Sequence, residues 1–474
     1  MVYCRKGNIN PDCRIDLDLS TISPLNDGAD MSVSPLELTS GYGSAPTAAD
    51  AGTATSEPSV AGRQTGDAPR ILLATTGHLP STARLAMELH AAGARVSLIS
   101  PRGHPGRVLT IFDRRMVYRA IAPLRSLEAA VSRVSPDLVI PCDERTVRDL
   151  HRLHRETADH DVRLLIQRSL GPADSFPVAA SRAEFLDVAR RQGVRLPPSM
   201  ALPSADALDE WMARNAAPFV LKADGTWSGF GVRIITEAAA AKPAYAEMTR
   251  RASGRLALRE MLLENNNFAI RSWLSAERPA MSVQGHIDGW PANIGVACWR
   301  GEVLAAICAE SVSTLSATGP STIARIIDNP EMVETARRVV KALGLSGLIG
   351  LDFMIEASTG YAYLIEMNPR CTPICPVPLG PGRDLAEALV AQLMKRAPRE
   401  RPAKTERDIL VFFPDTWQLD PSNQLMHTGY HDVPWEQPEL VRILMRPELR
   451  ERYWFTRVLR QAWWRLQGQQ PPGP

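Results

Sequence analysis

The chain carries at residues 347–370 the sequence Gly347-Leu-Ile-Gly-Leu-Asp-Phe-Met-Ile-Glu-Ala-Ser-Thr-Gly-Tyr-Ala-Tyr-Leu-Ile-Glu-Met-Asn-Pro-Arg370. Two largely apolar segments flank Ser358-Thr359-Gly360, a run of turn-forming residues. A three-residue loop with glycine in the left-handed conformation is a common way to close a hairpin. The stretch therefore predicts two antiparallel strands.

This hairpin brings two acidic residues together. A three-residue loop places Asp352 directly opposite Glu366, with their Cβ atoms about 5 Å apart. Asn368 shares their face because side chains alternate along a strand. Oxygen ligands without a nearby His or Cys suit Mg²⁺ or Mn²⁺, and the alternative is a solvated hairpin edge with incidental charges. Arg370 follows directly and is placed to bind a phosphoryl group or a carboxylate.

A second stretch combines a lysine with three glycines. It reads Phe219-Val-Leu-Lys-Ala-Asp-Gly-Thr-Trp-Ser-Gly-Phe-Gly-Val-Arg-Ile-Ile235. Glycines let the backbone approach a ligand, and successive N–H groups in such a loop form an anion-binding nest. Lys222 ends the first predicted strand and could reach phosphates held by that loop. Only six of the 54 basic residues are lysines, which favours a functional Lys222 over an ordinary hairpin with a lysine that reaches solvent.

Composition limits the class of protein. The 474 residues allow two to four domains. Residues 1–68 hold four basic and nine acidic residues, so the net charge of +2 divides into −5 for a tail that we expect to be disordered and +7 for the remainder. That excess suits anionic small molecules, and no basic cluster before the C-terminus is large enough for nucleic acid. The absence of long apolar runs and a secretory signal, together with seven cysteines, predicts a soluble, reduced, cytoplasmic protein.

Residues 70–170 alternate between strand and helix patterns, which is typical of a parallel α/β layer. Strands are expected at 70–76, 95–100 and 137–141, and helices at 81–92, 125–134 and 143–154. The layer is similar to a small Rossmann-like unit, but no Gly-x-Gly-x-x-Gly follows its first strand, which argues against NAD or FAD.

The C-terminal part is set off by Pro and charged residues near 397. Residues 397–474 are predicted to be a small extension that ends in an aromatic, basic helix at 453–466. We expect that helix to pack on the rest of the protein. Contact with a membrane surface or a partner is the alternative.

Lys222 with its glycine-rich loop, followed by Asp352 and then by Glu366-Met-Asn-Pro-Arg370, resembles the ATP-grasp superfamily. The likeness is to its carbamoyl-phosphate-synthase-like and carboxylate–amine ligase members. It covers residues 70–396, and the Glu-Met-Asn-Pro-Arg motif is its specific part. It implies an α/β fold, with a pre-ATP-grasp domain over 69–172 and a two-lobed α+β ATP-grasp domain over 173–396.

The resemblance also implies roles for individual residues. Lys222 would contact the α-phosphate and adenine of ATP, and Arg370 would stabilise a phosphorylated intermediate. The loop that closes over the β- and γ-phosphates would include Gly225, Ser228, Gly229 and Gly231. The magnesium ligands would be Asp352, Glu366 and Asn368.

Other positions depart from the superfamily pattern. Arg182 stands where most relatives carry a second phosphate-binding lysine. The adenine hinge matches Gln284, His286 and Ile287 but lacks its usual glutamate, so adenine recognition would rest on backbone groups. Arg325 is a candidate second phosphate clamp, and an arginine at a strand edge is the alternative.

These features predict an ATP- and Mg²⁺-dependent ligase. Such an enzyme would activate a small-molecule carboxylate as an acyl phosphate for attack by an amine or similar nucleophile. The alternatives are an ATP-binding regulatory or scaffold protein without turnover, and a carbamoyl-phosphate-synthase-like or carboxylase subunit that needs a partner chain. We also expect a homo-oligomer. The identities of the acid and the nucleophile do not follow from the sequence.

Overall fold

The computed structural model describes residues 68–224, 231–250, 279–316 and 318–446, which belong to one compact unit spanning 64–460. The tail predicted over 1–68, except its last residue, and the helix predicted over 453–466 lie outside these ranges. So do Gly225, Ser228 and Gly229 of the predicted phosphate loop. None of the described helices is long and apolar enough to cross a membrane.

Residues 70–170 form a parallel sheet with helices on both faces, as the sequence predicts. In the described chain its strand order is β3-β2-β1-β4. The strands are β1 (Arg70–Ala74), β2 (Arg95–Ser100), β3 (Arg114–Val117) and β4 (Leu138–Pro141), and the helices are α1 (Pro80–Ala91), α2 (Pro123–Val134), α3 (Glu144–Glu156) and α4 (His160–Leu170). Leu73 packs in the core that contains α1, whereas Leu72 packs in the core of α2, α3 and α4. Burial on both faces explains the continuous apolar run in β1.

The sequence pattern did not indicate β3 and α4. Strand β3 reads Arg-Arg-Met-Val, and its two arginines are exposed, so it has no apolar alternation. Helix α4 follows α3 after a short break and is capped by Asp159, whose side chain accepts hydrogen bonds from the backbone N–H groups of Asp161 and Val162. This cap is a local signal for a separate helix.

A small antiparallel sheet carries Lys222. Its order in the described residues is β5-β8-β6-β7. The strands are β5 (Ser199–Ala201), β6 (Phe219–Ala223), β7 (Val232–Ile235) and β8 (Met281–Gly285), and helices α7 (Ala205–Arg214) and α8 (Ala241–Met248) belong to the same lobe. Phe219, Leu221 and Ala223 point into the core of this lobe with Trp211. The intervening Lys222 therefore points from the opposite face of the sheet.

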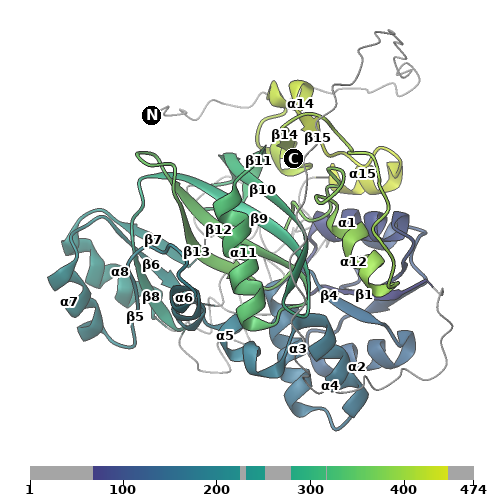
Figure 1. Cartoon of the computed structure of the whole chain (residues 1–474), viewed down its shortest axis with the longest axis horizontal. Helices are drawn as coiled ribbons and strands as arrows, with labels where there is room; N and C mark the ends of the chain where they lie inside the picture. Colours follow the sequence, from purple (N-terminus) through teal and green to yellow (C-terminus); the bar gives the residue numbers. More distant parts are fainter. Residues whose placement is uncertain (1–67, 225–230, 251–278, 317, 447–474) are drawn as a thin grey trace, which may run out of the picture. The chain divides into compact units, whose positions relative to one another are not determined.

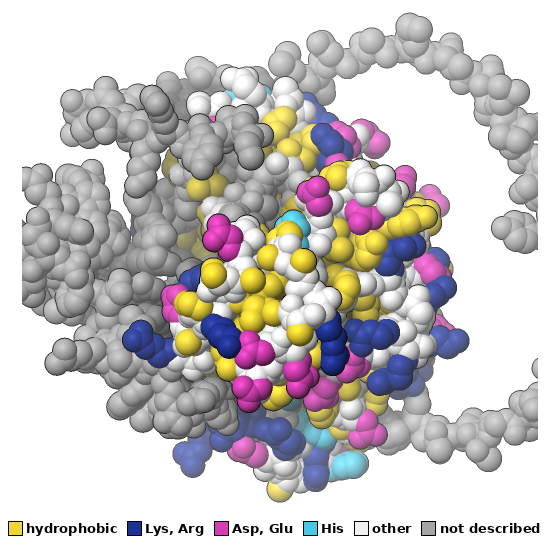
Figure 2. All heavy atoms as spheres, turned by 90° about the vertical axis from the view of Figure 1, so that its left-hand side faces the viewer, with side chains coloured by type: hydrophobic (Ala, Val, Ile, Leu, Met, Phe, Trp, Pro, Cys, Tyr) yellow, Lys and Arg dark blue, Asp and Glu magenta, His cyan; other side chains and the backbone are white. Residues whose placement is uncertain are grey.

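The face of the molecule on the side of α7 and α8 is shown in Figure 2. Basic and acidic side chains are interspersed over it, with hydrophobic side chains between them. The charges on this face therefore do not form a surface of a single sign.

A larger sheet forms the centre of the described unit, with the order β13-β12-β9-β10-β11-β14-β15. Its strands are β9 (Gly289–Trp299), β10 (Glu302–Thr314), β11 (Ser321–Ile327), β12 (Gly347–Glu356), β13 (Ala362–Asn368), β14 (Ile409–Val411) and β15 (Tyr430–His431). Helices α6 (Arg182–Arg191) and α11 (Pro330–Leu343) share one core with the sheet, and α5 (Phe176–Ala180) precedes α6. Helix α12 (Leu385–Leu393) packs with the other face and also contacts α1 (Figure 1).

The hairpin of β12 and β13 confirms the predicted pairing of Asp352 with Glu366, but not the predicted loop. Glu356 pairs with Tyr361 around a loop of four residues, 357–360, with Gly360 at φ +74°. Phe353 therefore faces Leu364, and a bulge at Ile365 restores the register at Glu366. A three-residue loop would have paired Phe353 with Ile365.

The bulge determines which way Glu366 points. Leu364 and Met367 both pack in the core shared with α11. In a regular strand, residues 364 and 366 would share that face. The extra residue at the bulge moves Glu366 and Asn368 to the opposite face, beside Asp352 and Gly350.

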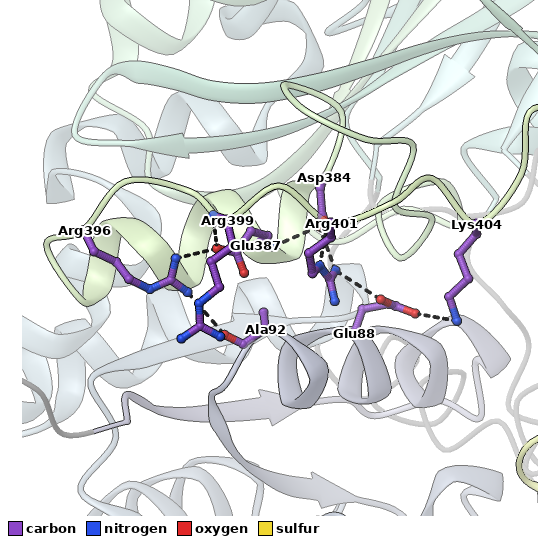
Figure 3. A network of polar contacts seen from close by, with 8 residues as sticks. All are labelled: Glu88, Ala92, Asp384, Glu387, Arg396, Arg399, Arg401 and Lys404. Carbon is purple, nitrogen blue, oxygen red and sulfur yellow. Dashed lines mark hydrogen bonds and ion pairs between the residues drawn. The ribbon is translucent and has the colours of Figure 1, made fainter. Parts of the chain in front are cut away.

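Residues beyond 397 are closely joined to the rest of the unit. Strand β14 pairs with β11 and so extends the large sheet. In the preceding segment Arg401 binds Asp384 and reaches Glu88 on α1, while Arg396 binds Glu387 on α12 (Figure 3). The short helices that follow are α13 (Asp415–Leu419), α14 (Leu425–Thr428) and α15 (Pro438–Leu444). The Pro- and Arg-rich segment is thus held by ion pairs.

We expect Arg401→Ala to lower the free energy of unfolding by about 2–3 kcal/mol, because it leaves the buried carboxylates of Asp384 and Glu88 without this partner. The side chain of Arg401 is 17% exposed, so solvent reduces the loss below that of a fully buried pair. Urea denaturation would measure it. Arg399→Ala is the matched control, because Arg399 binds Glu387 through its backbone N–H. Equal stability of the two variants would contradict the prediction.

Candidate active site

Asp352 and Glu366 form a carboxylate pair on neighbouring strands. They lie directly opposite each other in β12 and β13, and the Asn368 Nδ2 group donates to Asp352 Oδ2 at 2.8 Å. Burial raises the pKa of Asp352 to about 6, and the charge of Glu366 adds to this shift. The two carboxylates therefore repel each other in a partly buried place.

Arg182 compensates part of this negative charge. It is the first residue of α6, which begins after Ser181, whose hydroxyl caps the helix. Its guanidinium lies 3.0 Å from Glu366 Oε1 and 2.8 Å from Asp224 Oδ1. Burial acts to raise the pKa of Glu366, but the charges of Arg182 and Lys222 outweigh it and hold that pKa below its ordinary value.

Lys222 is nearly fully buried, with 5% exposure. Burial lowers its pKa to about 8, and repulsion from Arg182 adds to the shift, while Glu366, Asp352 and Asp224 oppose it. The lysine is therefore a poorly solvated cation that faces the carboxylates. Such a group is suited to binding an anion that enters the site.

A pocket that is partly open to solvent lies beside these groups, with about 390 Å³ of space when its open mouth is included. Its wall includes residues from the parallel sheet domain, from α6, from the lobe of Lys222 and from β13. These residues are Glu144, Ala179, Ala180, Ser181, Arg182, Phe185, Asp224, Glu366 and Met367. Of the residues predicted for the site, Arg182 and Glu366 line this cavity directly.

Arg370 joins this group just after β13. Its Nη2 donates to Asn368 Oδ1 at 3.0 Å, its Nη1 donates to the backbone oxygen of Cys371 at 3.2 Å, and its Nε lies 3.7 Å from Glu144 Oε2. The Asn368 amide is thus held between Arg370 and Asp352. The Asn368 oxygen thus accepts one hydrogen bond from Arg370, and its role as a magnesium ligand stays a prediction.

The predicted hinge joins the two sheets. Gln284 lies in β8, and His286 and Ile287 lie between β8 and β9. Gln284 is buried. Its Nε2 donates a hydrogen bond of 3.1 Å to the backbone oxygen of Ile365, which is the residue at the bulge. The hinge glutamine therefore links the lobe of Lys222 to the strand of Glu366. Gly231, which ends the predicted phosphate loop, accepts from the backbone N–H of Ala223 at 2.8 Å.

The structure does not bring Arg325 to the cavity. It lies on β11, 47% exposed, with its Nη1 2.7 Å from Glu310 and its Nε 3.7 Å from Asp408. Through the strand pairings, Arg325 aligns with Phe353, whose side chain is on the opposite face from Asp352. These contacts fit the alternative of an arginine at the strand surface, and a phosphate-binding role for it stays a prediction.

Three residues at the site were not predicted as site residues from the sequence: Glu144, Asp224 and Asn293. Asp224 follows Lys222 by two residues, so strand alternation could have indicated a shared face. Asn293 pairs with Asp352 across β9 and β12, and within the described residues its buried Oδ1 has no hydrogen-bond partner. Glu144 comes from the distant α3, and only the tertiary structure brings it to Arg370.

Residues 190–373 match the ATP-grasp domain family. This range contains Lys222, Asp352 and the whole Glu-Met-Asn-Pro-Arg motif. This segment of the chain is thus similar to ATP-grasp domains.

Solved structures show the same fold over most of the chain. A biotin carboxylase–β,γ-ATP complex from Campylobacter jejuni is 16% identical, has a TM-score of 0.50, and is matched over 71% of this chain and 73% of that one. An ATP complex of carboxyaminoimidazole ribonucleotide synthase from Aspergillus clavatus is 11% identical, also with a TM-score of 0.50, over 72% and 80%. No curated protein matches the sequence. Identities this low establish the fold and leave the reaction open.

Proposed function

We propose that the protein is an ATP- and Mg²⁺-dependent ligase, which phosphorylates a carboxylate and passes the resulting acyl group to an amine. The observation that carries the proposal is that two buried cations, Lys222 and Arg182, act on the carboxylates of Asp352 and Glu366, beside a pocket that Arg182 and Glu366 line. The ATP-grasp domain and the two ATP complexes of the same fold support nucleotide binding at this place.

The chemistry explains why such a site needs cations and no side-chain nucleophile. A carboxylate is a poor electrophile because its leaving group would be oxide, and phosphorylation supplies a better one. The barrier to phosphoryl transfer is lowered chiefly by positioning and by cations that offset the negative charge. Lys222 and Arg182 would hold the phosphates, and Arg370 would stabilise the acyl phosphate.

The residues present fit a hard divalent cation. Asp352 and Glu366 offer oxygen atoms in a partly buried place, where Glu366 raises the pKa of Asp352. The Oδ1 of Asn293, which has no hydrogen-bond partner among the described residues and belongs to the residue paired with Asp352, offers one more oxygen atom. When bound, Mg²⁺ or Mn²⁺ would neutralise charge on the transferring phosphoryl group.

A direct experiment separates a ligase from a nucleotide-binding protein without turnover. The full chain would be incubated with Mg²⁺, ATP and, one at a time, bicarbonate and the twenty standard amino acids, with hydroxylamine added to trap acyl phosphates as hydroxamates. We expect ADP and hydroxamate to form together with at least one acid. ATP binding without ADP from any acid would contradict the proposal and favour the regulatory protein.

The raised pKa of Asp352 predicts a pH dependence of metal binding. Below its pKa of about 6 the carboxyl is protonated, and the cation must displace that proton. The affinity for Mn²⁺ should therefore be about tenfold lower at pH 5 than at pH 7. Electron paramagnetic resonance of free Mn²⁺ would measure it. Asp352→Asn should bind Mn²⁺ weakly at both values, and an unchanged pH dependence in that variant would show that another group titrates.

A further inference from the structure

Glu144 is a cavity-lining acid from outside the ATP-grasp domain match. It is the first residue of α3, separated by two residues from the end of β4 in the parallel sheet, and it lines the cavity together with Arg182, Asp224 and Glu366. Its carboxylate lies 3.7 Å from Arg370 Nε. Ligands of open parallel sheets bind beyond the carboxyl ends of the strands, where Glu144 is placed.

The neighbouring Asp143 holds Glu144 firmly in position. As the cap of α3, the Asp143 carboxylate accepts from Thr146 N at 2.9 Å. The same carboxylate accepts from the hydroxyl of Thr75 at 2.8 Å and from the hydroxyl of Thr76 at 3.0 Å, just after β1. The start of α3 is thereby tied to the end of a neighbouring strand. A carboxylate on such a rigid element keeps its place when a substrate binds.

The charges around Glu144 compensate its negative charge only in part. Arg370 and Arg148 attract its charge, Glu366 and Asp143 repel it, and its contact with Arg370 is longer than a hydrogen bond. Burial raises the pKa of Glu144, in spite of the two arginines. Its side chain keeps 23% exposure, so it remains accessible from the cavity. Glu144 is thus a carboxylate with an increased tendency to take up a proton, beside the arginine expected to hold the acyl phosphate.

We propose that Glu144 is the general base that binds the incoming amine and accepts its proton. The proposal rests on the ligase function proposed above. In this step the amine nitrogen forms a bond to the acyl carbon, and the bond from that carbon to the phosphate oxygen breaks. Phosphate leaves with the electron pair, and the proton lost by nitrogen passes to the carboxylate of Glu144. Glu144 thereby selects a nucleophile that arrives as an amine.

The main alternative is that Glu144 only holds Arg370, and hydroxylamine separates the two roles. Hydroxylamine is largely unprotonated and strongly nucleophilic at neutral pH, so it needs little help from a base. We expect Glu144→Gln to form hydroxamate within about threefold of the wild-type rate. Amide formation from ammonium chloride or an amino acid should fall about 100-fold or more, which is the usual effect of losing a general base.

The control is Glu156→Gln, at the other end of α3, where the glutamate is 48% exposed and paired with Arg152. It should change neither rate. Equal losses of hydroxamate and amide in Glu144→Gln would overturn the proposal and assign Glu144 to the positioning of Arg370. If Glu144→Gln does not fold, Glu144→Asp carries the same test, because its withdrawn carboxylate should slow amide formation selectively.

Measurements on the wild-type protein separate the proposed role of Glu144 from the proposed ligase function. If hydroxamate forms but no amine from this set yields an amide, the role of Glu144 is wrong while carboxylate activation stands. If neither hydroxamate nor ADP forms, the ligase function itself fails.

Discussion

Glu366→Gln should lower the rate of ADP release at least about 100-fold while leaving the protein folded. The substitution keeps the size of the side chain and removes the charge that lies opposite Asp352 and 3.0 Å from Arg182. A neutral amide is a weaker ligand for Mg²⁺ than a carboxylate. Arg182 then retains only its contact with Asp224 among its two acidic partners. Both effects reduce the compensation of charge during phosphoryl transfer.

The measurement is ADP release at saturating Mg²⁺ with the acid found to be active, together with the melting temperature. Glu334→Gln is a suitable control, because Glu334 lies on α11, 49% exposed, and pairs with Arg338. It should keep wild-type activity. A folded Glu366→Gln variant with more than about one third of the wild-type rate would remove Glu366 from the metal site.

Lys222→Met should weaken ATP binding about 100-fold and raise the melting temperature. The first effect follows from losing a desolvated cation that would contact phosphate. The second follows from its pKa of about 8, which is lower than the ordinary 10.5. At pH 7 the protein therefore bears a cost of about 3 kcal/mol for keeping this lysine charged, and methionine fills a similar volume without charge.

Whether Lys222 stabilises or destabilises the folded protein can be measured from the pH dependence of the free energy of unfolding. Between about pH 8 and pH 10.5 the unfolded chain binds more protons at Lys222 than the folded protein, so this group makes stability increase with pH in that window. Lys222→Met should lack that contribution. Lys341→Met, at an exposed position on α11, is the control for both measurements. A lower melting temperature for Lys222→Met than for this control would show that the carboxylates stabilise the lysine more than burial destabilises it.

Much of the fold and part of the site could be predicted because they depend on local patterns. Strand and helix periods are visible over about ten residues, which is why the strand expected at 95–100 and the helix expected at 125–134 agree with β2 and α2. The short hairpin brings Asp352 and Glu366 near each other, although their direct pairing depends on the bulge at Ile365, and a single strand places Lys222. Asn368 and Arg370 are close in sequence to Glu366, so they also arrive together.

The sequence by itself therefore determined the motif that resembles the ATP-grasp superfamily and the alternation of strands and helices over 70–170, since each depends on patterns within short segments. Only the tertiary structure decided the bulge at Ile365, because Leu364 and Met367 must both reach the core of α11. It also joined β14 to the large sheet and brought Glu144 to Arg370 across more than 200 residues. Such contacts depend on how separate elements pack against each other, and the local periodicity of the sequence does not predict that packing.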